Sequence, residues 1–166
     1  AFTELAKAFQ ASHPEWQLQQ TSQWMNQAQR LRPHFWAYLQ REGKVTEPMM
    51  ALRLYGSSSD FGVSLEVSFI ERKKDEQTLG KQAKVLEIPT VEGIYYLAYS
   101  DGQSQRWEAN EENRRTLREK LRSQEVRKVL VKADVSVTEN SSEEDIVENL
   151  LKSYDKILPF YLATRN

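Results

Sequence analysis

Residues 94–109 read IYYLAYSDGQSQRWEA, and the Asp101-Gly102 pair at their centre is the clearest local signal in the chain. A two-residue hairpin loop of this kind needs positive φ at both central positions, which favours Asp followed by Gly. The flanking runs are strand-like, with aromatic residues that pack well on a pleated surface. The segment therefore predicts two antiparallel strands joined by a tight turn.

Strand-like runs also occur earlier in the chain, at residues 34–40, 49–56 and 61–71. The first two are separated by a charged loop, which predicts a second hairpin, and SSSD at 57–60 predicts a turn before the third. The third run alternates, with one face carrying Val63, Leu65, Val67 and Phe69 and the other carrying Ser64, Glu66 and Ser68. Such alternation is typical of an antiparallel sheet with one face in water.

Helical spacing predicts helices over residues 3–11, from Thr21 to Pro33, over 75–88 and over 111–122, and a last helix after NSSEED at 140–145. Asn110 is the expected N-cap of the fourth helix. Ser141 and Glu144 are the expected capping box of the last one, which Pro159 should kink or end. With a further strand over 126–132, these elements predict a single α+β domain over residues 1–166. It contains a mostly antiparallel sheet of about six strands with helices packed on one face.

The composition excludes several classes of function. The net charge of −1 gives no global basic field, so binding to nucleic acid would have to come from local patches. The absence of cysteine removes disulfides and thiolate chemistry, and the scattered glycines form no phosphate-binding loop. We therefore expect no cofactor and no metal. No apolar run is long enough to span a membrane and the N-terminus is no signal peptide, so we expect a cytoplasmic protein without membrane contact.

One pattern at the end of the third strand would suit an enzyme. Glu71 and Lys73 match the Glu-x-Lys of metal-dependent PD-(D/E)xK nucleases, in which an acid binds the metal and a lysine orients water. Asp60 would be the second acid. A continuous strand, at about 3.3 Å per residue, would hold Asp60 and Glu71 roughly 36 Å apart. We therefore favour a non-enzymatic binding module and keep the nuclease as the alternative.

Two groups of residues favour nucleic acid as the ligand. Residues 114–132 hold eight Lys or Arg and two Glu, a local balance of +6. Within them Arg114, Arg118 and Arg122 recur every fourth residue, so they share one helix face that could bind phosphates. Near the N-terminus, Trp36 with Arg30 and Arg32 is the candidate for contact with an unpaired base, since aromatic rings stack on bases.

The second half of the chain also resembles a known family. GIYYLAYSDGQSQRWEAN, then a charged helix, then SEEDIVENLLKSYDKIL resemble the end of the N-terminal DNA-recognition domains of McrB-type modification-dependent restriction proteins. In that family an aromatic strand pair precedes a final acidic helix that leads to a motor domain. The resemblance covers under half of the chain. It implies a targeting domain of a restriction or defence system, with DNA and a C-terminal motor domain as partners.

A third reading needs no nucleic acid. The acidic C-terminal helix, or an exposed edge of the sheet, could instead be the contact surface of a protein–protein interaction domain. Residues 133–166 hold seven acidic and three basic residues, which fits a basic partner.

Overall fold

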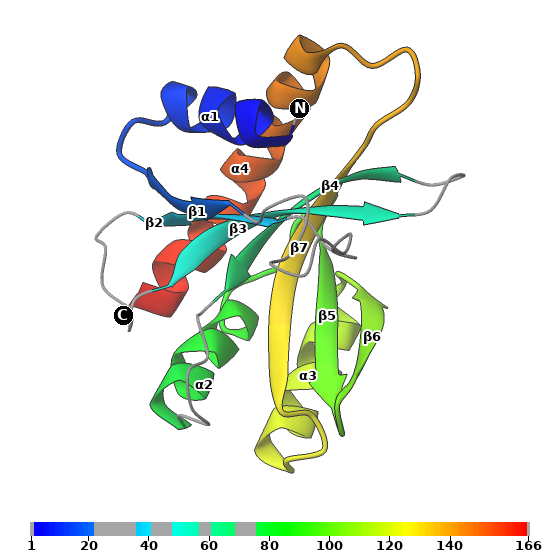
Figure 1. Ribbon diagram of the computed structural model, residues 1–166. Helices are drawn as coiled ribbons and strands as arrows, with labels where there is room; N and C mark the ends of the chain where they lie inside the picture. Colours follow the sequence, from blue (N-terminus) through cyan, green and yellow to red (C-terminus); the bar gives the residue numbers. More distant parts are fainter. Residues whose placement is uncertain (1, 22–35, 41–47, 57–60, 69–75, 166) are drawn as a thin grey trace, which may run out of the picture.

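The computed structural model describes residues 2–21, 36–40, 48–56, 61–68 and 76–165, whose elements are built around one twisted sheet (Figure 1). The helices are α1 (Phe2–Ser12), α2 (Glu76–Gln82), the 3-10 helix η1 (Ala83–Leu86), α3 (Glu111–Arg122) and α4 (Glu143–Arg165). The strands are β1 (Gln17–Thr21), β2 (Trp36–Gln40), β3 (Met49–Gly56), β4 (Phe61–Ser68), β5 (Tyr95–Ser100), β6 (Gln103–Glu108) and β7 (Lys128–Ser136).

The sheet has the order β1-β2-β3-β4-β7-β5-β6 and every neighbouring pair is antiparallel. The α+β class and the antiparallel sheet are therefore confirmed. Within the described residues the sheet has seven strands, where the sequence predicted about six. The strand that the sequence did not reveal is β1, whose residues QLQQT carry a single apolar side chain and give no alternation.

The predicted hairpin around Asp101-Gly102 is present. Ser100 pairs with Gln103 across the turn, and Asp101 and Gly102 have φ values of 50° and 75°. The strands predicted at 34–40 and 49–56 pair as β2 and β3, also antiparallel. The last strand lies slightly later than expected, because β7 covers Lys128–Ser136 and not 126–132.

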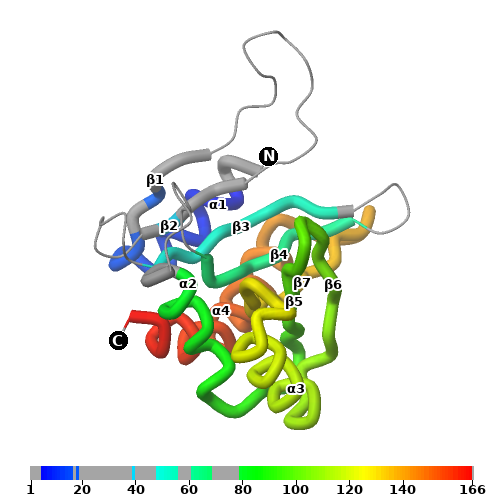
Figure 2. Tube along the Cα trace, turned by 90° about the horizontal axis from the view of Figure 1, so that it is seen from below, coloured from blue at the N-terminus to red at the C-terminus, as the bar shows by residue number. Residues whose placement is uncertain are grey.

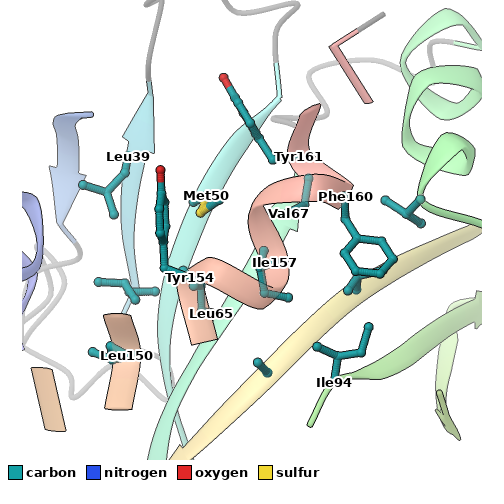
Figure 3. Close-up of a cluster of buried hydrophobic side chains, with 14 of the residues drawn as sticks. Leu39, Met50, Leu65, Val67, Ile94, Leu150, Tyr154, Ile157, Phe160 and Tyr161 are labelled. Carbon is teal, nitrogen blue, oxygen red and sulfur yellow. The ribbon is translucent and has the colours of Figure 1, made fainter. Parts of the chain in front are cut away.

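All the helices that contribute to the main core lie on one face of the sheet. Buried apolar residues of α1, η1, α3 and α4 form one cluster with the strand positions of that face. Helix α4 supplies the largest share, and Figure 3 shows its side chains among those of β2, β3 and β4. Its buried residues are Leu150, Tyr154, Ile157, Phe160, Tyr161 and Thr164.

Helix α4 differs from the sequence prediction at its start. Its capping box is formed one residue later than expected. The Ser142 hydroxyl accepts the N–H of Asp145 at 3.0 Å, and the Asp145 carboxylate accepts the N–H of Ser142 at 3.3 Å. The helix continues through Pro159 to Arg165 and does not end there.

The expectation that the polar face of β4 is exposed to solvent is wrong. Ser64 and Glu66 are each only 1% exposed, and Ser68 is 8% exposed. On this face the side chains of Arg53 on β3 and Lys132 on β7, the two strands that flank β4, contact Glu66 and form ion pairs with it. The polar side chains of β4 therefore need partners within the fold.

Some expectations fall outside the described residues. These are the turn at 57–60, Phe69 on the apolar face of the third predicted strand, and most of the helix from Thr21 to Pro33. Thr21 itself is the last residue of β1. Among the helices that the structure describes, none combines the length and the apolar content needed to cross a bilayer.

Candidate nucleic-acid interface

Helix α3 packs on the sheet through one buried residue and exposes most of its other side chains, fully or partly, to solvent. The Asn110 side chain accepts the N–H of Asn113 at 2.7 Å, which caps the helix as predicted. Glu111 and Glu112 begin the helix while Lys120 and Arg122 end it, so the charges complement the helix dipole. Leu117 is buried in the core cluster and holds the helix to the sheet.

Arg114, the first of the predicted phosphate contacts, is engaged within the protein. Its Nε donates to the Leu86 carbonyl at 2.8 Å and its Nη2 to the Glu87 carbonyl at 2.9 Å. Its Nη1 forms an ion pair with Glu111 at 2.8 Å. These contacts fix α3 to η1, and they occupy the guanidinium that a phosphate would need.

Glu111 is stabilised in its charged form by hydrogen bonds at the contact between α3 and the residues after η1. The backbone N–H of Thr90 donates to its carboxylate at 3.1 Å. That hydrogen bond and the one from Arg114 keep the pKa of Glu111 below its usual value. The N-terminal turn of α3 therefore binds to η1 and to the loop that follows it, and has a structural role.

The rest of the predicted row differs from Arg114. Arg118 is partly exposed and Arg122 is exposed, and neither has an acidic partner among the residues that the structure describes. Arg115 shares these properties and lies on the same flank, because spacings of three and four residues bring side chains together on a helix. We call Arg115, Arg118 and Arg122 the arginine row. The sequence prediction missed Arg115 because it followed a strict four-residue spacing.

Three other cations of the sheet and of α3 form ion pairs. Lys120 Nζ lies 2.8 Å from Glu125, Arg106 Nη1 lies 3.7 Å from Asp134, and Lys132 Nζ lies 3.5 Å from Glu66. The arginine row is therefore a local excess of positive charge, which is the property that phosphate binding requires.

The predicted base contact lies in a different part of the molecule. Trp36 is the first residue of β2, where the strand register places it opposite Arg53. Strand β2 is next to the edge strand β1, whereas α3 lies beside β5 and β6 at the other edge (Figure 1). The structure therefore does not bring Trp36 and the arginine row together. Arg30 and Arg32 lie outside the described residues.

The face of the sheet opposite the helices holds a polar network that the sequence prediction also missed. Glu66 on β4 is buried between Arg53 on β3 and Lys132 on β7, and forms ion pairs with both. Cross-strand alternation explains the arrangement. Glu66 is opposite Lys132 on β7, and Arg53 lies two residues along β3 from Ala51, the residue opposite Glu66, so the three side chains share one face. The sequence did show polar positions on one face of β4, namely Ser64, Glu66 and Ser68. They were interpreted as a solvent-exposed face and not as a buried polar network.

The network continues onto the neighbouring strands. The Tyr95 hydroxyl donates to Asp134 at 2.8 Å, and the Arg106 guanidinium lies 3.9 Å from the centre of the Tyr95 ring. Burial, together with the hydrogen bond to Asp134, raises the pKa of Tyr95 far above its usual value. Glu66 and Asp134 both have cations beside them, so the network satisfies its own charges and fits a structural role.

The residues of the alternative nuclease site, Asp60, Glu71 and Lys73, lie outside the described residues. Within the described residues, no group of three His, Cys, Asp or Glu side chains could hold a metal ion.

Comparisons with known proteins give no relative for this chain, since no family model, curated protein or solved structure matches it.

Proposed function

We propose that this chain is a non-enzymatic nucleic-acid-binding module whose arginine row contacts the phosphate backbone. The observation that carries the proposal is the position of Arg115, Arg118 and Arg122 on one flank of α3, without acidic partners among the described residues. Guanidinium groups bind phosphate oxygens with paired hydrogen bonds, and exposed arginines are well suited to this.

The proposal that the ligand is DNA is supported by the resemblance found in the sequence. The resemblance over residues 93–110 and 142–158 favours DNA and a targeting role in a restriction or defence system, in the cytoplasm. The net charge of −1 means that attraction acts only near α3. Three phosphate contacts would give binding that weakens with salt and does not depend on base sequence.

The test is binding to labelled duplex and single-stranded oligonucleotides, modified and unmodified, followed by fluorescence anisotropy over a range of salt concentrations. Replacing the arginine row by Arg115→Gln, Arg118→Gln and Arg122→Gln should weaken binding at low salt by about tenfold or more. It should also lower the slope of log K against log salt by about 2.7, or 0.9 per lost phosphate contact on duplex DNA.

A matched control removes the same charge elsewhere. Lys7→Gln, Lys152→Gln and Lys156→Gln alter exposed lysines of α1 and α4 and change the net charge equally. This variant should keep most of the affinity. Equal losses in the two triple variants, or no salt-sensitive binding by the original chain, would overturn the proposal.

A further inference from the structure

An apolar groove lies at the other end of the molecule, between α1, the start of α4 and the ends of β3 and β4. Its volume is about 340 Å³. The residues that line it include Leu5, Leu54, Phe61, Val137, Ile146 and Glu143. Figures 1 and 2 both show α1 and α3 at opposite ends, so the groove is separate from the arginine row.

The groove exposes the large aromatic side chain of Phe61, whose backbone is held in the sheet. Phe61 is 45% exposed, although it begins a strand whose other residues are all buried. The N–H of Val137 donates to the Phe61 carbonyl at 2.9 Å, which holds these two parts of the lining together. Leu5 and Val63 are buried beneath it. The groove is therefore formed before any ligand arrives, which lowers the entropic cost of binding.

The chain that borders the groove is acidic. Glu143 lines the groove, while Glu139, Glu144 and Asp145 are close in sequence to the lining residues Val137, Glu143 and Ile146. Glu139, Glu143, Glu144 and Asp145 are all exposed, and no described Lys or Arg forms an ion pair with any of them. We call these four residues the acidic rim. The sequence contains no Lys or Arg from Ala133 to Leu151. Acids in the first turn of α4 complement its dipole, but Glu139 precedes the helix and gains nothing from it.

We propose that this groove docks a peptide segment of a partner protein, in which one large apolar side chain is flanked by lysine or arginine. The apolar side chain would cover Phe61 and fill the space above Leu54 and Ile146. The basic residues would pair with the acidic rim, which gives the site its charge selectivity. The same rim repels nucleic acid and anionic lipid surfaces, and so disfavours them as occupants.

A second copy of the chain fits the groove less well. Among the described residues the other exposed large apolar side chains are Val91 and Leu162, and Val91 is followed by Glu92. Leu162 lies near Arg165 and could enter the groove of another copy. Unless two copies exchanged Leu162 reciprocally, that contact would join different surfaces and propagate head to tail.

The test begins with selection of random peptides displayed on phage against the full immobilised chain. The enriched peptides should share an apolar residue next to Lys or Arg. A labelled synthetic peptide of that sequence should bind with an affinity that falls as salt increases. Phe61→Asp should weaken its binding at least tenfold, and Glu139→Gln with Glu143→Gln should weaken it and reduce its salt dependence.

Two controls make the result specific. Val91→Asp and Leu162→Asp place the same charge on equally exposed apolar residues, and each should leave peptide binding unchanged. The two glutamine substitutions lie on the surface, so they test the site even where Phe61→Asp disturbs folding. Enriched peptides without this pattern, or equal binding by the groove variants, would overturn the proposal. So would oligomers in sizing experiments that both Phe61→Asp and Leu162→Asp abolish, because they would identify a second copy as the occupant.

Discussion

The indole N–H of Trp16 donates a 2.9 Å hydrogen bond to the hydroxyl of Tyr154, and so joins residues 138 positions apart in the sequence. Both side chains are buried, and the Tyr154 ring also stacks on His13 with 4.0 Å between the ring centres. The contact ties the turn between α1 and β1 to the middle of α4. It accounts for His13 as a packing residue.

Tyr154→Phe should test this connection. The substitution keeps the ring but leaves the buried indole N–H of Trp16 without its acceptor, so the free energy of unfolding should fall by about 1–3 kcal/mol. Tyr96→Phe is the matched control, since the buried Tyr96 hydroxyl has no hydrogen-bond partner among the described residues. Urea denaturation should show a lower midpoint for Tyr154→Phe and little change for Tyr96→Phe. Equal midpoints for the two variants would show that the hydrogen bond contributes nothing.

The buried ion pairs of Glu66 lead to a second prediction. Glu66→Gln removes the charge that Arg53 and Lys132 share, so stability should fall by about 3–5 kcal/mol, as expected when one partner of a buried pair is lost. Adding Lys132→Met should restore part of the loss. A double-mutant cycle from urea denaturation measures this coupling.

An exposed pair on α4 provides the comparison. Glu148 and Lys152 lie 3.5 Å apart, and each side chain is 68% exposed. The cycle of Glu148→Gln and Lys152→Met should give a coupling near zero, because water screens the pair. Similar couplings in the two cycles would contradict the view that burial makes the Glu66 pairs important.

Two glycines should respond to alanine in opposite ways. A Cβ at Gly62 would collide with the Tyr55 hydroxyl and with the Val135 carbonyl, and the backbone of β7 cannot move aside. Gly62→Ala should therefore cost about 1–3 kcal/mol or more. A Cβ at Gly80 on α2 meets nothing within 4 Å, so Gly80→Ala should stabilise the protein by about 0.5–1 kcal/mol. Thermal unfolding of both variants measures the difference, and a shift of the same sign in both would refute it.

The sequence predicted the elements whose signals are local. The Asp101-Gly102 turn needs only its own backbone angles, and the Asn110 cap needs only the N–H of Asn113. Both are as predicted, because neither depends on distant residues. The α+β class follows from such elements, since hairpins lead to an antiparallel sheet.

The errors arose where distant residues decide the outcome. The alternation of β4 correctly separated its two faces, but the burial of Glu66 depends on side chains of other strands that contact it, such as Arg53 and Lys132. Likewise, the spacing of arginines on α3 does not reveal that Arg114 reaches the carbonyl of Leu86, 28 residues away. The candidate site could be predicted as a basic helix. Which of its arginines is available to a ligand is a property of the packing between α3 and η1.

Alkaline pH should destabilise the protein through its buried tyrosines. Burial raises the pKa of Tyr96 from 10.0 to about 12. A raised pKa in the folded state means that the folded protein holds this proton more tightly than the unfolded chain. The resulting stabilisation is complete below pH 10 and is lost as the pH rises from 10 through 12.

Over that interval Tyr96 alone should lower the free energy of unfolding by about 1.4 kcal/mol per pH unit, and Tyr95, whose pKa is also raised, should add to the slope. Tyr96→Phe removes one titrating group, so its stability should fall less steeply with pH. Urea denaturation at a series of alkaline pH values measures both slopes. Parallel curves for the two proteins would mean that Tyr96 ionises equally easily in the folded and unfolded states, and hence that its hydroxyl is not shielded from water.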